Sequence, residues 1–280
     1  LGLEAACASL TEAGDRVLGL DNGIFGKGFA DFVSMYGGEP VLFTSDYHNP
    51  IDVEALRAFA AERGYPFRMH GITERHKQQL EEEFPGCFDF TEDSDFADYI
   101  YSADKLATYS GKALHGKKNH CNRFEAENDW EFVPLTRELI PGCMDMLDVW
   151  SEENSDRLEK SITYEHDAIV RAFAAYEKLG LEGGVLKSGG RIVGFTVGEL
   201  ASRDTLDVHF EKAEGSINGA YPMVCREMTR MAMARHPELK YINREDDMGL
   251  EALRFSKLSY KPEFMLKKYT ACWKCGEAAE

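Results

Sequence analysis

The chain has 280 residues, of which 44% are hydrophobic and 29% charged, a composition typical of a globular protein and not of a disordered one. Its 49 acidic and 32 basic residues give a net charge of −17, which excludes a general basic surface for DNA. A polyanion would therefore need a local basic patch. No apolar run approaches the roughly 18 residues of a transmembrane segment, and we expect no signal peptide.

Seven scattered cysteines indicate reduced thiols and a cytoplasmic location. Because the chain begins at Leu1 and not at Met, we expect it to be truncated. Cys272 and Cys275 have the spacing of a redox or zinc motif, but no second pair accompanies them, so we predict no metal site.

Alternating helices and strands are predicted in the first part of the chain, with glycine turns between them that favour a β-α-β arrangement. The predicted segments are a helix over 4–10, a strand over 16–20, a helix over 28–38 and a strand over 40–46. Asp52 is then expected to cap a helix that ends at Gly64.

The next part is less regular. We expect a strand over 65–72, a helix that Thr73 starts and that ends near Pro85, and strands over 87–90 and 96–102. A polar helix is predicted over 112–128.

From Trp130 the pattern becomes regular and predicts the order β, α, α, β-hairpin, β, α, β, α, β. Thr136 is expected to cap the first helix, and the second is expected to end at Gly180. In the strand over 205–212, Leu206, Val208 and Phe210 alternate with polar residues, which predicts one core face and one polar face. A last strand is predicted over 263–269.

Four long strings carry a resemblance to a known family. They are FRMHGIT (67–73), DYIYSADKLATYSGKALHGKKNHCNRF (98–124), VHFEKA with the following GAY (208–221), and YINREDDMGLEALRFSKLSY (241–260). Over about residues 55–270 the chain resembles the phosphatidylglycerol lysyltransferase C-terminal-domain family, whose members carry two GNAT-like halves in tandem and are related to Fem-type aminoacyl transferases.

The resemblance implies an α/β fold: a GNAT acyltransferase-like domain preceded by an incomplete or altered second GNAT-like half. The implied boundaries are a partial N-terminal half over 55–129, a GNAT-like domain over 130–271 and a tail over 272–280. The implied function is aminoacyl transfer from aminoacyl-tRNA to a lipid, peptide or small-molecule acceptor.

The first part of the chain, up to about residue 60, resembles instead a fragment of a class V, PLP-dependent aminotransferase. The boundary of this fragment is expected at residue 54, so it covers residues 1–54. The positions that hold the cofactor in that family, including the Schiff-base lysine, have no counterpart here. We therefore expect no PLP, and an aminotransferase fragment is the weakest of the alternatives.

A GNAT-like domain places its chemistry where two parallel strands separate, here between 205–212 and 239–243. His209 and Glu211 share the polar face of the first strand and are candidate catalytic residues, with His209 as the proton acceptor. A structural strand histidine is the alternative. After the second strand, the candidate substrate-binding residues are Asn243, Arg244, Glu245 and Asp247.

Arg244 suits a phosphate or carboxylate, and Glu245 or Asp247 suits an ammonium group, although Asp246 or Asp247 could also cap the next helix. Gly219 and Tyr221 are further candidate substrate-binding residues at the start of a long helix. Glu211 and Glu214 precede this turn where coenzyme A users carry a cation, and their charge would repel a pyrophosphate. Coenzyme A is therefore disfavoured. Gly219 could also simply let the chain enter the helix.

One cationic cluster lies within 112–123 and includes Lys112 and His115. It predicts contacts to phosphates of tRNA or of a lipid headgroup. A solvated helix face paired with the acidic stretch 81–98 is the alternative. The candidate phosphate- or tRNA-binding residues are Lys117, Lys118, Asn119, His120, Asn122 and Arg123.

The first function hypothesis is an acyltransferase of the aminoacyl-transfer type. The second is a non-catalytic GNAT-like binding module that keeps the cleft without turnover. We expect aminoacyl-tRNA and a lipid or small-molecule acceptor as partners, and neither DNA nor a transmembrane segment.

Overall fold

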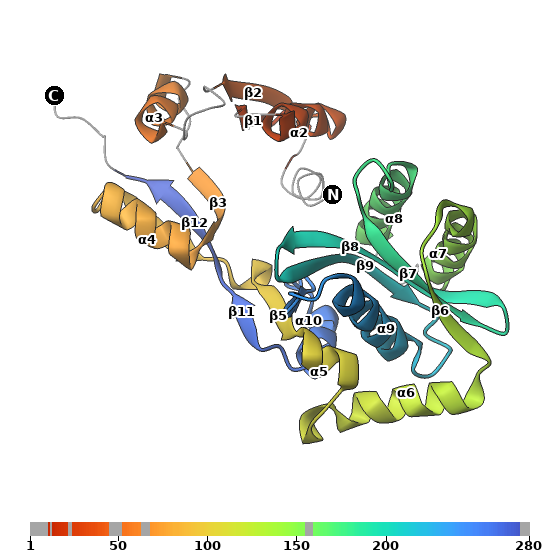
Figure 1. Ribbon diagram of the computed structural model, residues 1–280. Coiled ribbons are helices and arrows are strands. Elements are labelled where there is room, and N and C mark those ends of the chain that lie inside the picture. Colours follow the sequence, from red (N-terminus) through yellow and green to blue (C-terminus); the bar gives the residue numbers. More distant parts are fainter. Residues whose placement is uncertain are drawn as a thin grey trace. The chain divides into compact units, whose positions relative to one another are not determined.

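The computed structural model describes residues 11, 13–21, 24–44, 52–62, 68–154 and 159–274 (Figure 1). The chain divides into two compact units, one formed by Leu1–Glu92 with Tyr269–Glu280 and the other by Asp93–Lys268. These geometric boundaries differ from the family-based ones at 54, 129 and 271, which stay predictions. The helix expected over 4–10 lies outside the described residues.

The first unit begins with the predicted β-α-β arrangement. Strand β1 (Arg16–Asp21), helix α2 (Ile24–Met35) and strand β2 (Glu39–Thr44) follow one another, and the two strands pair in parallel. Helix α3 (Val53–Glu62) comes next, and the side chain of Asp52 caps it by accepting from the Ala55 N–H at 3.0 Å. The expected stop at Gly64 lies outside the described residues.

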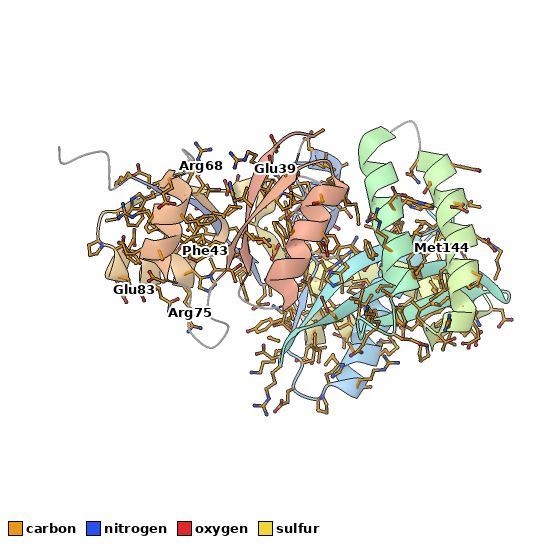
Figure 2. The ribbon with its side chains drawn as sticks, turned by 90° about the horizontal axis from the view of Figure 1, so that it is seen from above. Glu39, Phe43, Arg68, Arg75, Glu83 and Met144 are labelled. Carbon is orange, nitrogen blue, oxygen red and sulfur yellow. The ribbon has the colours of Figure 1, made fainter. Side chains whose placement is uncertain are left out.

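A second, three-stranded sheet completes this unit. It has the order β3-β12-β4, and helix α4 (Glu74–Glu83) follows β3 from its cap at Thr73. The strands are β3 (Arg68–Thr73), β4 (Phe88–Glu92) and β12 (Lys268–Trp273). Its core contains Phe88 and Trp273, whose ring centroids lie 4.8 Å apart. Phe43 of β2, labelled in Figure 2, packs edge-on against Phe59 at 5.3 Å.

The single strand expected over 263–269 is wrong. Strand β11 (Phe264–Leu266) pairs with β5 (Asp98–Ser102) in the second unit, whereas β12 pairs with β4 in the first. The chain thus leaves one sheet after Leu266 and enters another, because Tyr269 is already opposite Glu92.

The second unit contains a seven-stranded sheet with the order β11-β5-β10-β9-β8-β7-β6. Its β10 runs parallel to β9 and antiparallel to β5. A tight turn at Gly189 and Gly190, both at positive φ, joins β7 to β8 as predicted. The remaining strands are β6 (Trp130–Pro134), β7 (Glu182–Ser188), β8 (Arg191–Ser202), β9 (Thr205–Ala213) and β10 (Tyr241–Asn243).

Helices cover both faces of this sheet (Figure 1). Helix α9 (Ala220–Arg235) packs on one face together with α5 (Ala103–Thr108) and α6 (His115–Glu127), around fully buried residues such as Phe124 and Met223. Helices α7 (Ile140–Asn154) and α8 (Glu159–Ala174) lie on the other face, and α10 (Glu251–Ser259) follows β10. The element order predicted from Trp130 is confirmed up to α10, after which two strands replace the single one expected.

Several predicted helix ends are displaced. The helix predicted from Lys112 starts as a 3₁₀ turn over Lys112–Leu114. Thr136 forms no side-chain cap, because a 3₁₀ turn over Arg137–Leu139 precedes α7. Helix α8 ends at Ala174 and not at Gly180. A third 3₁₀ turn, Ser94–Phe96, precedes β5. None of the described helices is long and apolar enough to cross a bilayer.

A β-bulge interrupts the central strand at His209. Phe210 is opposite Val197 and Val208 is opposite Gly198, so His209 is an extra residue on β9. Gly198 is required here, because an added Cβ would lie 2.2 Å from the carbonyl oxygen of Asp207. Leu206, Val208 and Phe210 are all buried as predicted. The bulge, however, means that alternate residues no longer share one face of the sheet beyond Val208.

Gly219, directly before α9, packs closely against the backbone of α6. It has φ of 88°, and a Cβ added there would lie 2.4 Å from the backbone oxygen of His120 on α6. We expect Gly219→Ala to lower the free energy of unfolding by at least about 1–3 kcal/mol, since alanine at positive φ is strained and the backbones would have to separate. Urea unfolding measures this loss.

Gly116→Ala is the matched control. Gly116 lies on α6, the helix that Gly219 contacts, but open space surrounds its Cβ position. Gly116→Ala should therefore leave the free energy of unfolding unchanged or raise it by up to about 1 kcal/mol. Equal effects of the two substitutions would show that the close approach of α6 and α9 does not constrain the fold.

Candidate functional site

The parallel strands β9 and β10 pair over only three residues. Thr205, Leu206 and Asp207 are opposite Tyr241, Ile242 and Asn243, after which β10 ends while β9 continues to Ala213. Among the described residues, no strand therefore pairs with the second half of β9 on this side. The two strands separate as predicted, and side chains bridge the gap.

The first bridge is a buried ion pair. Arg244, directly after β10, donates from Nη2 to Glu211 Oε1 of β9 at 2.7 Å, and the two side chains are only 11% and 9% exposed. The guanidinium lies over the Tyr260 ring at 4.5 Å. Its Nη1 is buried and has no hydrogen-bond partner among the described residues. Arg244 thus keeps one buried donor for a further acceptor.

Two lysines complete what we call the Arg244 cluster: Arg244, Glu211, Lys117, Lys257 and Tyr260. Lys117 Nζ of α6 lies 3.8 Å from the centre of the Tyr260 ring. Lys257 Nζ of α10 donates to the backbone oxygens of Arg244, at 2.5 Å, and of Asp246. The cluster has three cationic side chains and one carboxylate, so it favours an anion.

The protonation equilibria reflect this crowding. Burial and the neighbouring Arg244 lower the pKa of Lys257 to about 8, and the same two causes lower the pKa of Lys117. Burial raises the pKa of Glu211 although Arg244 and Lys117 oppose the rise. Glu211 is therefore a stronger proton acceptor than an exposed glutamate.

The second bridge forms what we call the His209 cluster: Asp207, His209, Glu245 and Glu199. His209 Nδ1 lies 2.9 Å from Glu245 Oε1, and Nε2 lies 3.2 Å from Glu199 Oε1 of β8. The His209 side chain is 6% exposed, whereas those of Glu245 and Glu199 are 40% and 47% exposed. The imidazole is thus enclosed between carboxylates that reach solvent.

Carboxylates dominate the electrostatics of this cluster. Burial lowers the pKa of His209, but the carboxylates of Glu245, Asp207 and Glu199 outweigh it, so the pKa is raised. Burial and the Glu245 carboxylate raise the pKa of Asp207 to about 7. Both ring nitrogens of His209 are engaged, which makes the predicted role of proton acceptor harder for this residue.

The structure does not bring His209 and Glu211 to one cluster. Because His209 is the bulge residue, Glu211 lies on the same side as Leu206 and Val208, where it contacts Cys225 of α9. The shared polar face expected from the sequence is therefore wrong, although each residue faces the segment that follows β10.

Asn243 and Asp247 hold the backbone after β10. Asn243 accepts from the Glu245 N–H at 2.8 Å and donates to Asp98. Asp247 is 2% exposed and accepts from Tyr99, the Gly249 N–H and twice from Arg254. The bonds from Arg254 lower its pKa to about 2 against the opposing effect of burial. These contacts favour a structural role for both residues.

The start of α9 is covered by another element. The backbone of His120 on α6 reaches Gly219, and His120 Nδ1 lies 2.7 Å from Asn218 Oδ1. Tyr221 accepts from Trp150 Nε1 of α7 at 2.8 Å and is half-buried. Neither Gly219 nor Tyr221 belongs to the two clusters just defined.

The predicted phosphate-binding residues are spread along α6. Lys117 belongs to the Arg244 cluster, and Arg123 pairs with Glu127 one turn further on the same helix at 2.8 Å. In the acidic stretch 81–98, Asp95 and Asp98 pair with Arg254 and Lys268 and not with this helix. The exposed members of the predicted set are Lys118, Asn119, His120, Asn122 and Arg123.

Sequence reasoning missed Asp207, Glu199, Lys257 and Tyr260. Asp207 lies two residues before His209 on the predicted strand, which was a usable signal. The other three come from distant segments, and only the fold places them here. Cys272 lies in β12, and Cys275 is outside the described residues, so its predicted lack of a metal role stays a prediction.

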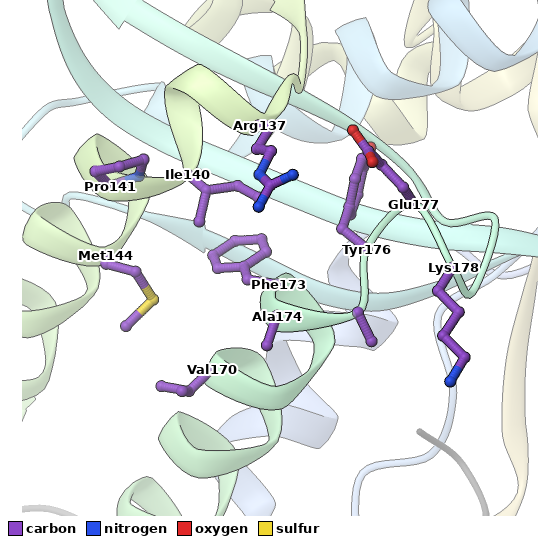
Figure 3. Close-up of a pocket in the computed structure, with 11 residues that line it drawn as sticks. Arg137, Ile140, Pro141, Met144, Val170, Phe173, Ala174, Tyr176, Glu177 and Lys178 are labelled. Atoms are coloured by element: carbon purple, nitrogen blue, oxygen red, sulfur yellow. The ribbon is translucent and has the colours of Figure 1, made fainter.

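A separate pocket of about 520 Å³ lies between the ends of α7 and α8 (Figure 3). Arg137, Ile140, Met144, Phe173 and Tyr176 are among the residues that line it. None of the sequence-predicted site residues lines it.

The comparisons with known proteins can now be placed beside this geometry. The family model "Phosphatidylglycerol lysyltransferase, C-terminal" matches residues 27–272. It begins inside the segment that resembled an aminotransferase, so residues 27–54 belong to the matched region, while the resemblance of residues 1–26 stays a prediction.

A conserved protein of unknown function from Bacteroides thetaiotaomicron is 39% identical, with a TM-score of 0.75 over 79% of this chain and 74% of that one. The structure of L-PGS from Bacillus licheniformis has a TM-score of 0.52 at 20% identity, over 95% of this chain and 80% of that one, and shows a shared fold.

An uncharacterized protein of Mycoplasmoides gallisepticum is 28% identical over 178 residues, and the match spans 61% of this chain but only 54% of that protein. The predicted α/β, GNAT-like fold is confirmed. The matched family, the shared fold and the separated strand pair agree, and the chain belongs to the phosphatidylglycerol lysyltransferase C-terminal family.

Proposed function

We propose that this acyltransferase-type chain moves an aminoacyl group from aminoacyl-tRNA to a lipid, peptide or small-molecule acceptor, in the cytoplasm where charged tRNA is available. The observation that carries the proposal is the Arg244–Glu211 pair at the point where β9 and β10 separate. A buried donor that has no partner in the described part of the chain meets a carboxylate with a raised pKa there.

The reaction needs a held ester and a proton acceptor. The acceptor's hydroxyl or amine attacks the ester carbonyl, the bond to the ribose oxygen of the tRNA breaks, and the nucleophile's proton passes to a base and then to that oxygen. Glu211 suits this base, because its pKa is raised while it stays within hydrogen-bond distance of Arg244. His209 suits it less, since carboxylates engage both of its ring nitrogens.

The cations of the Arg244 cluster suit the anionic part of the substrates. Arg244 Nη1 lacks a partner among the described residues, and Lys117 and Lys257 are crowded against Arg244. A phosphate of the tRNA end or of a lipid headgroup would relieve this repulsion. The exposed cations Lys118 and Arg123 on the same helix as Lys117 extend the basic surface for the tRNA backbone.

The covered start of α9 supports a donor other than coenzyme A. A pyrophosphate at a helix N-terminus needs exposed backbone N–H groups. Here α6 packs against Gly219, and the preceding Glu214 is buried in an ion pair with Arg191. We therefore propose that this chain does not use coenzyme A. We also propose no PLP, because the sequence lacks the context of a Schiff-base lysine.

The donor is tested by incubating the protein with radiolabelled aminoacyl-tRNAs and, separately, with labelled acetyl-CoA. Label should move from a tRNA into a lipid, peptide or amine pool. Transfer of label from acetyl-CoA but from no tRNA would contradict the proposal that aminoacyl-tRNA is the donor. Transfer from neither would favour a non-catalytic binding module.

Removing the proton acceptor should slow transfer without abolishing substrate binding. We expect Glu211→Gln to lower the transfer rate by about 10²- to 10⁴-fold, the usual contribution of a general base, with little change in tRNA affinity by filter binding. The control is Glu131→Gln. Glu131 is an exposed glutamate of β6 that pairs with Lys187 of β7. Rates are normalised to the folded fraction by circular dichroism. An unchanged rate in folded Glu211→Gln contradicts the assignment.

The pH profile should show the same group. Burial raises the pKa of Glu211, and a base must be deprotonated to accept a proton. The transfer rate should therefore fall as the pH drops through this raised pKa, at a pH above the ordinary glutamate value of about 4.3. Glu211→Gln should lose this acid limb. If the limb persists in the variant, another group titrates.

A further inference from the structure

The His209 cluster contains a set of metal-ligand atoms that the transfer chemistry does not use. One ligand atom each from Asp207, His209 and Glu245 lies within 4.8 Å of the other two. Asp207 and His209 come from β9, and Glu245 comes from the turn after β10. A divalent ion with ligand distances near 2.0–2.2 Å would need only small side-chain movements to reach all three.

The histidine is oriented as in metal centres. Its Nδ1 faces Glu245 at 2.9 Å, whereas Nε2 is bonded to Glu199 at 3.2 Å. A carboxylate on the far nitrogen fixes the tautomer and ring orientation of a metal-ligating histidine. Glu199 thus holds Nε2 of His209 in place. Nδ1 is the nitrogen that lies beside the carboxylates of Glu245 and Asp207.

A second, independent observation comes from Asp207. Its Oδ1 is buried and has no hydrogen-bond partner among the described residues. A buried carboxylate oxygen normally has a donor or a cation beside it. In the described part of the chain, neither Asp207 nor Glu245 forms an ion pair with lysine or arginine. The neighbouring lysines bond elsewhere: Lys257 to the backbone oxygens of Arg244 and Asp246, and Lys268 to Asp98.

The cluster is also open on one side. Glu245 and Glu199 are 40% and 47% exposed, which provides an entry path and room for water ligands. Nitrogen and carboxylate ligands suit borderline and hard first-row ions such as Zn²⁺ and Mn²⁺. We propose that Asp207, His209 and Glu245 bind one divalent first-row metal ion, with Glu199 as the positioning residue of His209.

Mn²⁺ is the first probe, because thiolates bind it poorly and the free cysteines of the chain therefore do not compete. The full chain is stripped with chelator, dialysed and titrated with Mn²⁺, and the loss of the free-ion electron paramagnetic resonance signal is recorded. We expect one Mn²⁺ per chain, displaced by Zn²⁺. Failure of both ions to bind overturns the proposal.

Variants assign the site. Glu245→Gln and Glu199→Gln change half-exposed side chains and should fold, and each should weaken Mn²⁺ binding at least about 10-fold. Asp207→Asn should also weaken Mn²⁺ binding at least about 10-fold. The matched control is His166→Ala, which removes a half-buried histidine on the α7–α8 face, 3.0 Å from Asp148, and should leave binding unchanged. Unchanged affinity in both glutamate variants, or equal loss in the control, overturns the site.

The titration is done without tRNA, lipid or acetyl-CoA, so its result is independent of the transfer assay. Lysine methyl ester is titrated in parallel by calorimetry. If the ester binds in a Glu245-dependent manner while Mn²⁺ and Zn²⁺ do not, the cluster recognises an ammonium group and the metal proposal is wrong.

Discussion

The ion pair between Arg244 and Glu211 is the contact on which the site depends. β10 stops pairing with β9 after Asn243. Backbone hydrogen bonds with Tyr99 of β5 still hold the following turn at Arg244 and Glu245, each at 3.1 Å. On the β9 side, the contact with this turn is made by side chains. A buried charge is tolerated only when it is paired, and loss of one partner of such a pair costs about 3–5 kcal/mol. The pair therefore keeps the strands apart and the turn attached, with Lys257 holding the same turn through its carbonyls.

The bulge at His209 gives the strand two different chemical sides. Without the extra residue, His209 and Glu211 would project together and their partners would mix. Instead, the cationic side chains gather with Glu211 near α9, and the carboxylates gather with His209 near β8. One inserted residue, accommodated by Gly198, thus separates an environment rich in cationic side chains from one rich in carboxylates within a single strand.

Much of the fold could be predicted from the sequence, because periodicity and turn residues are local. The hairpin at Gly189-Gly190 and the β-α-β start are examples. The site was only partly predictable: Arg244 and Glu211 were named, but their pairing and the partition of His209 were not. A bulge leaves no periodic signal. Lys117, Lys257 and Tyr260 converge from three separate segments, so only tertiary structure brings them to Arg244.

The central strand of the first unit's three-stranded sheet is contributed by the far end of the chain. β12 lies between β3 and β4, although some 175 residues separate β4 from it along the sequence. During synthesis, β3 and β4 emerge early and have no strand between them until residues 268–273 have left the ribosome. The β3-β12-β4 sheet can therefore form only after residues 268–273 have been synthesised, and a product that stops after β11 would expose the unpaired edges of β3 and β4.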